Sequence, residues 1–128
     1  MRVVIVDPDL KAGRKLAASV EKMLPSADVL LYAESQEALT GIETHSPDVT
    51  FVAPDVNGMS GPEFLAQART KSEQPQKHET KYVGTVDKPD ADASTAWISA
   101  GAALVVARPV DSLGIRTALR FVGGGIDL

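Results

Sequence analysis

The sequence lacks cysteine and has few aromatic residues, which make up 5% of its 128 positions. Without cysteine, disulfides, thiol catalysis and cysteine–zinc sites are excluded. The two histidines, His45 and His78, lie far apart in the chain and so argue against a histidine-rich metal site. No apolar run approaches the roughly 18 residues that span a bilayer, and the N-terminus has no signal-peptide layout. We therefore expect a cytoplasmic protein with no membrane partner.

A strong excess of one charge is also missing, because the net charge is only −4. Basic residues gather near the N-terminus at Lys11, Arg14, Lys15 and Lys22, but Glu21 interrupts them. So few charges indicate a solvated helix face and do not predict nucleic-acid binding by this domain. The length and the 44% apolar content suit one soluble domain with its own core.

What the chain does contain is a regular alternation of short apolar runs with amphipathic helical stretches. Five apolar runs end in polar or turn residues and are expected to be strands: Arg2–Val6, Val29–Tyr32, Val49–Ala53, Tyr82–Val86 and Ala103–Ala107. Helical spacing follows each run, with expected caps or starts at Asp9, Ser35, Ser60 and Asp111 or Ser112, and a fourth helix through Ala96.

This order predicts an α/β fold in which a parallel sheet is covered on both faces. We expect a (βα)5 flavodoxin-like three-layer sandwich with five parallel strands in the order 2-1-3-4-5. The polar stretch Thr70–Lys81 is expected to be a loop. Residues 1–122 are expected to form the domain, and the Gly-rich residues 123–128 a tail or the start of a linker to a C-terminal effector domain.

Polar side chains stand at the ends of the predicted strands, where ligands bind in such sheets. Asp7 and Asp9 are weak candidates for holding Mg²⁺, which binds one or two carboxylates plus water. The Thr85 hydroxyl could donate to a phosphoryl oxygen, and Arg108 could pair with phosphate or with a carboxylate. The simpler interpretation is that Asp9 caps a helix and Arg108 pairs with Asp7.

Several of these residues belong to motifs that stand in a recognisable order. They are Val4-Ile5-Val6-Asp7, Ser46-Pro47-Asp48-Val49-Thr50-Phe51-Val52, Gly58-Met59-Ser60-Gly61-Pro62-Glu63-Phe64-Leu65, Thr85, Ala100-Gly101-Ala102 and Arg108-Pro109-Val110. Over nearly all of its length, the chain thereby resembles the receiver domain of two-component response regulators, of the chemotaxis-receiver type. The resemblance implies a non-enzymatic module of a phosphorelay.

The chain departs from this family where the family's chemistry takes place. By the resemblance, Ala53 stands at the position of the phosphoacceptor aspartate, and Pro8 at that of a Mg²⁺-binding carboxylate. Arg108 replaces the family's lysine, and Val105 replaces its aromatic switch residue. The resemblance therefore implies a degenerate pseudo-receiver that takes no cofactor and binds Mg²⁺ weakly or not at all. The vestigial pocket would comprise Asp7, Pro8, Asp9, Asp55, Thr85 and Arg108.

Two alternatives remain open from the sequence. A shifted register would make Asp55 the phosphoacceptor of a working receiver, although it would break the spacing to Gly58. Asp7 and Asp9 also resemble the nucleophile and general acid of haloacid-dehalogenase-type phosphatases. In that family a threonine or valine is usual where Lys11 stands, and the chain is short for that fold with a cap.

A module without phosphorylation would act through its surface. In the resembled family, partners and dimer mates use the fourth helix, the fifth strand and the fifth helix. We therefore expect another signalling protein, or a homodimer mate, to bind outward-pointing Ile98, Val105 and Phe121. The family usually has a small residue where Trp97 stands, so this side chain should push the fourth helix outward or lie partly exposed.

Overall fold

The computed structural model describes residues 1–71 and 80–122. Its elements are β1 (Arg2–Val6), α1 (Leu10–Met23), β2 (Asp28–Tyr32), α2 (Ser35–His45), β3 (Val49–Val52), β4 (Asp55–Val56), β5 (Met59–Ser60), α3 (Gly61–Lys71), β6 (Lys81–Val86), α4 (Ala91–Ala100), β7 (Leu104–Ala107) and α5 (Ser112–Val122). Among these described residues, no helix is long and apolar enough to cross a membrane.

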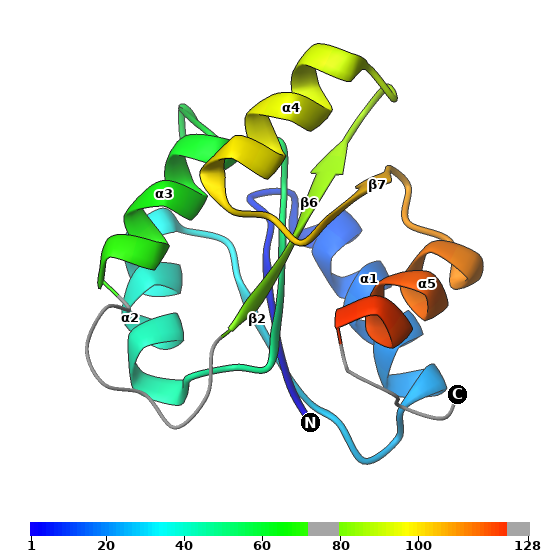
Figure 1. Ribbon diagram of the computed structural model, residues 1–128. Coiled ribbons are helices and arrows are strands. Elements are labelled where there is room, and N and C mark those ends of the chain that lie inside the picture. The colour runs from blue at the N-terminus through cyan, green and yellow to red at the C-terminus, as the bar shows by residue number, and fades with distance from the viewer. Residues whose placement is uncertain (72–79, 123–128) are drawn as a thin grey trace.

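The central sheet has five parallel strands in the order β2-β1-β3-β6-β7. This is the predicted order 2-1-3-4-5, and the predicted α/β fold is confirmed. Helices α1 and α5 cover one face of the sheet, and α2, α3 and α4 cover the other (Figure 1). Because successive strand residues point to opposite faces, each strand contributes side chains to two separate cores.

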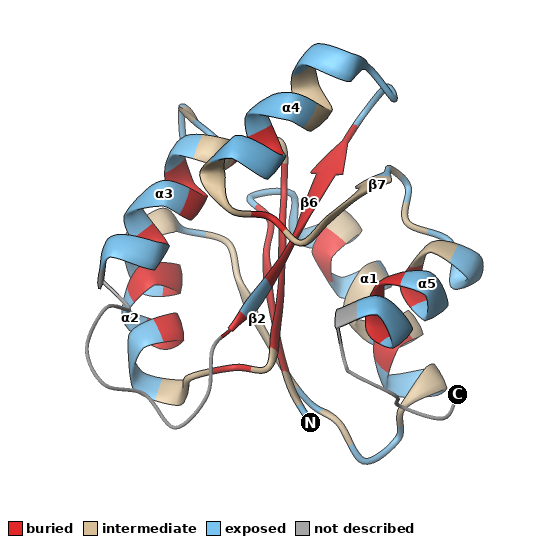
Figure 2. Cartoon of the chain, in the orientation of Figure 1, coloured by how far each residue is buried: buried red, intermediate tan, exposed pale blue. Residues whose placement is uncertain are grey.

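The two cores occupy the two faces and are almost closed to water. Val3, Ile5 and Phe51 pack toward α1 and α5, whereas Val4 and Val52 pack toward α2, α3 and α4. Figure 2 shows the result, with buried strands in red and exposed outer helix surfaces in blue.

Side-chain caps begin four of the helices, among them α4, where Asp90 Oδ1 accepts from the N–H groups of Asp92 and Ala93. The Asp9 carboxylate accepts hydrogen bonds from the backbone N–H groups of Lys11 and Ala12, which confirms it as the cap of α1. Ser60 Oγ accepts from the Glu63 N–H, and Asp111 Oδ1 accepts from the Gly114 N–H.

The expected cap at Ser35 is wrong. Glu34 is the N-cap of α2 and makes no side-chain capping hydrogen bond. The Ser35 N–H donates instead to Asn57 Oδ1 at 2.7 Å, so a distant side chain satisfies this helix start. Sequence spacing could not reveal a cap that lies 22 residues away.

The segment after β3 folds into a short antiparallel hairpin of β4 and β5. Asn57 and Gly58 form its turn, with φ angles of 55° and 82°. This left-handed conformation is readily adopted by asparagine and glycine. Asp55 Oδ1 accepts from the Gly58 N–H at 3.0 Å, which ties the turn to its first strand.

The expected loop from Thr70 to Lys81 is too long at both ends. Thr70 lies in α3, and Lys81 begins β6. Residues 72–79 of that loop lie outside the described residues, as does the expected tail 123–128.

Of the two outcomes expected for Trp97, partial exposure is excluded. Its side chain is only 2% exposed. The indole lies against Gly61 and Gly84, where a Cβ atom would collide with the ring. Two glycines on other elements therefore make the room that the local pattern of α4 did not indicate.

Candidate functional site

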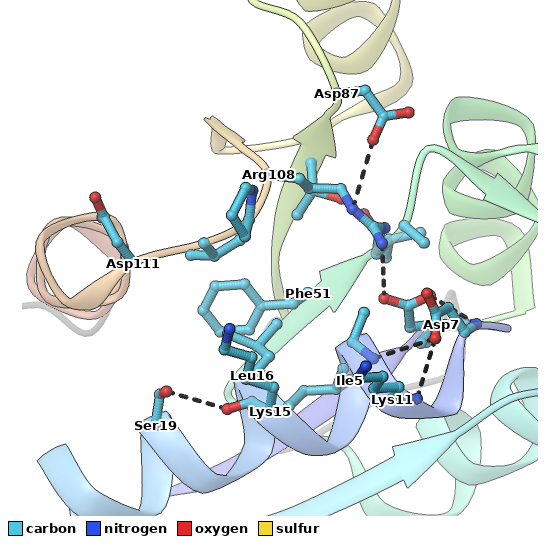
Figure 3. Close-up of a pocket in the computed structure, with 18 of the residues that line it drawn as sticks. Ile5, Asp7, Lys11, Lys15, Leu16, Ser19, Phe51, Asp87, Arg108 and Asp111 are labelled. Atoms are coloured by element: carbon cyan, nitrogen blue, oxygen red, sulfur yellow. Dashed lines mark hydrogen bonds and ion pairs between the residues drawn. The ribbon is translucent and has the colours of Figure 1, made fainter.

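A cavity of about 640 Å³ lies at the carboxyl end of the sheet, between α1 and the segment that joins β7 to α5 (Figure 3). Five of the residues named from the sequence line it together: Asp7, Asp9, Ala53, Thr85 and Arg108. Pro8 and Asp55 are not among its lining residues. The strand order thus brings together groups that are up to about a hundred positions apart in sequence.

Asp7 is the buried acid of this cavity. It follows β1 and is 7% exposed. One carboxylate oxygen accepts from the Asp9 N–H at 2.9 Å, and the other lies 3.3 Å from Arg108 Nη2. Burial raises the pKa of Asp7 above its ordinary value, while the Asp9 N–H and the Arg108 guanidinium oppose that rise.

Arg108 joins three segments at the end of the sheet. Its Nη2 pairs with Asp7, and its Nε lies 3.7 Å from Asp87 Oδ1. Because the Asp87 side chain is 81% exposed, we regard this second pair as the weaker one. The expected Asp7–Arg108 pair is confirmed, and the Arg108–Pro109 peptide that follows is cis.

The other polar groups named from the sequence also have internal partners. Asp9 caps α1, and the Thr85 hydroxyl donates to the Val52 carbonyl oxygen at 2.8 Å. In this conformation the Thr85 hydroxyl proton is therefore directed to the backbone of β3. The simpler interpretation of the strand ends, a cap and an ion pair, describes the observed geometry.

Ala53 follows β3 directly and is 4% exposed. Its N–H donates to the Val6 carbonyl oxygen at 2.9 Å, so the backbone still follows the sheet at this point. Its methyl group is all that the side chain presents to the cavity. Asp55, two residues further on, lies exposed in the hairpin.

Several cavity residues were not identified as site residues from the sequence. Lys11 and Lys15 project toward the cavity from α1, and Phe51, Asp87 and Asp111 also line it. The two lysines are four positions apart, which puts both on one helix face, and this spacing could have identified them from the sequence. Across residues 1–71 and 80–122, no group of three or more acidic or histidine side chains is arranged to hold a metal ion.

The expected interaction residues are only partly outward. Ile98 is 53% exposed and Phe121 is 64% exposed, as predicted. Val105 departs from the prediction, because it is half-buried and packs against the core beneath α4. Leu113, at 71% exposed, is an apolar surface residue that the sequence analysis missed.

No family model and no curated protein matches the sequence. Solved structures do match it, among them the signal receiver domain of a DNA-binding response regulator from Colwellia psychrerythraea 34H, with a TM-score of 0.82 and 18% identity over 96% of this chain and 98% of that one.

Chemotaxis protein CheY4 of Vibrio cholerae matches with a TM-score of 0.80 and 17% identity, over 94% of this chain and 97% of that one. A two-component response regulator from Clostridium difficile matches with a TM-score of 0.81 and 14% identity, over 95% and 94%. The chain therefore has the fold of response regulator receiver domains.

Proposed function

We propose that this chain is a signalling domain with a receiver fold that works without phosphorylation, through contacts with other proteins. The observation that carries the proposal is Ala53, the residue after the central strand β3, whose methyl group lines the cavity beside Asp7, Thr85 and Arg108. A methyl group has no lone pair with which to attack phosphorus, so no phosphoryl group can be accepted there.

Weak or absent Mg²⁺ binding follows from the way the carboxylates are used. Mg²⁺ needs oxygen ligands in near-octahedral geometry. The Asp7 carboxylate faces the cationic Arg108 at 3.3 Å, and the Asp9 carboxylate accepts two backbone hydrogen bonds. A metal ion would have to displace these partners, so the donor set does not fit it well.

The two alternatives from the sequence have less support. Asp55 is exposed in the hairpin, and its carboxylate is hydrogen-bonded to the turn. For a phosphatase, Asp7 would have to act as a nucleophile while paired with Arg108, and Asp9 as an acid while capping α1. Neither engagement favours catalysis.

The first experiment is intact-mass spectrometry after incubation with Mg²⁺ and acetyl phosphate. We expect no phosphoryl adduct, while a receiver domain that has the aspartate gains one under the same conditions. An adduct would contradict the proposal. The Asp55→Asn and Asp7→Asn variants would then show which carboxylate accepted it, and so distinguish a working receiver from a phosphatase-like protein.

The output surface is proposed to lie over α4 and α5, the helices that flank the edge strand β7 (Figure 1). Ile98 and Phe121 expose apolar area there, and exposed apolar patches mark interaction sites. The partner would be another signalling protein or a second copy of this chain.

Sedimentation of the chain over a range of concentrations tests the second-copy form of this idea. If the chain dimerises, Ile98→Glu or Phe121→Glu should shift it to monomer. The matched control is Leu10→Glu, which puts the same charge on an apolar residue of α1 that is 44% exposed. If the dimer persists in Ile98→Glu and in Phe121→Glu but dissociates in Leu10→Glu, this surface is ruled out.

A further inference from the structure

The cavity between α1 and the β7–α5 segment has a size and lining that the proposed function does not use. Its volume of about 640 Å³ falls within the range of about 300–1,000 Å³ that is typical of small-molecule sites. Leu16, Phe51 and Ile5 line one side, where Leu16 is half-buried and the other two side chains belong to the core and are 1% exposed, and charged groups stand around it (Figure 3). An apolar wall with a few convergent polar groups is the usual composition of a ligand site.

The carboxylates around the cavity already have partners within the protein. Asp7 and Asp87 face Arg108. Asp9 and Asp111 accept backbone hydrogen bonds at the starts of α1 and α5. Each carboxylate of the lining therefore has a partner within the protein, although Asp7 and Asp87 share one guanidinium and Asp9 and Asp111 keep their charge.

The two lysines are not balanced in this way. Lys11 and Lys15 have exposed side chains, and neither makes an ion pair with any residue in the described part of the chain. Standing four residues apart on α1, they repel each other, which slightly destabilises the helix. The first turn of α1 contains no acidic residue, and the carboxylate that precedes it, Asp9, is engaged as the N-cap. An anion between the two ammonium groups would remove this repulsion.

We propose that this cavity binds a small amphipathic organic anion, one with an aromatic or alicyclic body and a single acidic group. The body would pack mainly against Leu16 and touch only the edge of Phe51, which is 1% exposed. The acidic group would lie between Lys11 and Lys15, away from the Asp7 carboxylate. A neutral molecule of the same shape would gain only the apolar contact.

A matched pair of fluorescent probes tests the size and the charge preference of the site. Anilinonaphthalene sulfonate is an amphipathic aromatic anion, and phenylnaphthylamine is its neutral parent without the sulfonate. We expect the folded chain to bind one sulfonate probe per chain, and the neutral probe more weakly. No phosphodonor is present, so the result does not depend on whether the chain accepts a phosphoryl group.

Variants of α1 then locate the site. The Lys11→Gln/Lys15→Gln double variant should bind the sulfonate about tenfold more weakly, with the neutral probe unchanged. Its control is Arg14→Gln/Lys22→Gln, which removes the same charge from the same helix outside the cavity lining. Because all four side chains are exposed or at the helix end, these variants require no repacking.

A filled cavity should bind neither probe. Ala12 lines the cavity, so Ala12→Leu should abolish binding, whereas Ala18→Leu on the exposed side of α1 should not. Sulfonate binding that survives Ala12→Leu would place the site elsewhere and overturn the proposal. Equal binding of both probes, unaffected by the lysine variants, would overturn the anionic ligand class. Absence of binding by the wild-type chain would overturn the proposal altogether.

Discussion

The two faces of the sheet are packed in different ways. On the face covered by α2, α3 and α4, a fully buried Trp97 fits against Gly61 and Gly84. On the face covered by α1 and α5, the helices leave a cavity of about 640 Å³ at the carboxyl end of the sheet. Close packing is therefore concentrated on the first face, whereas the second face retains a cavity that is lined by charged residues. Variants on the two faces should therefore differ in size and in kind.

The largest effect is expected for Trp97→Ala on the closely packed face. Removing a fully buried indole should lower the free energy of unfolding by about 3–5 kcal/mol, because the space between the glycines cannot close. Since Trp97 is the only tryptophan, urea unfolding should be followed by circular dichroism. The adjacent Ile98→Ala, at an exposed position, should change the value by less than about 0.5 kcal/mol. Similar values for both variants would contradict the picture.

Gly84→Ala should have the next largest effect, because its new Cβ would meet the indole ring of Trp97. Overpacking of this kind lowers the free energy of unfolding by about 1–3 kcal/mol. The penalty should shrink in the Trp97→Ala background, where the ring is gone. A double-mutant cycle measures this coupling, and additive effects would show that the two residues do not compete for space.

Thr50 on β3 is a flaw in the closely packed face. Its hydroxyl is buried and has no hydrogen-bond partner in the part of the chain that the structure describes. Thr50→Val should therefore raise the free energy of unfolding by about 1 kcal/mol. The matched control is Thr85→Val, which removes a hydroxyl that donates to Val52 and should lower the value by about as much. Changes of the same sign would refute this distinction.

The smallest effect concerns pH and the Asp7 carboxyl on the open face. Burial raises the pKa of Asp7 above its ordinary value of 3.8, so between those two pKa values the folded chain holds a proton that the unfolded chain releases. Stability from this group is thus present below pH 3.8 and is lost as the pH rises through the raised pKa. Asp7→Asn should gain stability relative to wild type over that interval, as urea unfolding at several pH values would show.

The Arg108→Gln variant tests the Asp7–Arg108 ion pair by changing its other partner. The guanidinium lowers the pKa of Asp7, so its removal should raise that pKa further and extend the loss of stability to higher pH. If the two variants follow parallel pH curves, Asp7 does not titrate as this geometry requires.

Much of the fold follows from local patterns that are readable in the chain. The continuous apolar strands and the intervening helices predicted the doubly wound sheet, and Asp9 was identified as a cap from its place before α1. The Asp7–Arg108 pair was also predictable, because parallel order brings the ends of β1 and β7 to one edge. The cap at Ser35 and the partial exposure of Trp97 were wrong predictions, because the true neighbours of both residues lie far away in sequence.

The sequence by itself determined the order of the elements, the chemistry of the strand ends and the absence of an oxygen at Ala53. These depend on residue type and on periodicity along the chain. Only the tertiary structure decided that Trp97 is buried, that Val105 is half-covered and that a cavity opens beside Lys11 and Lys15. Such outcomes depend on how surfaces from distant segments fit together, and close packing leaves no local trace in the sequence.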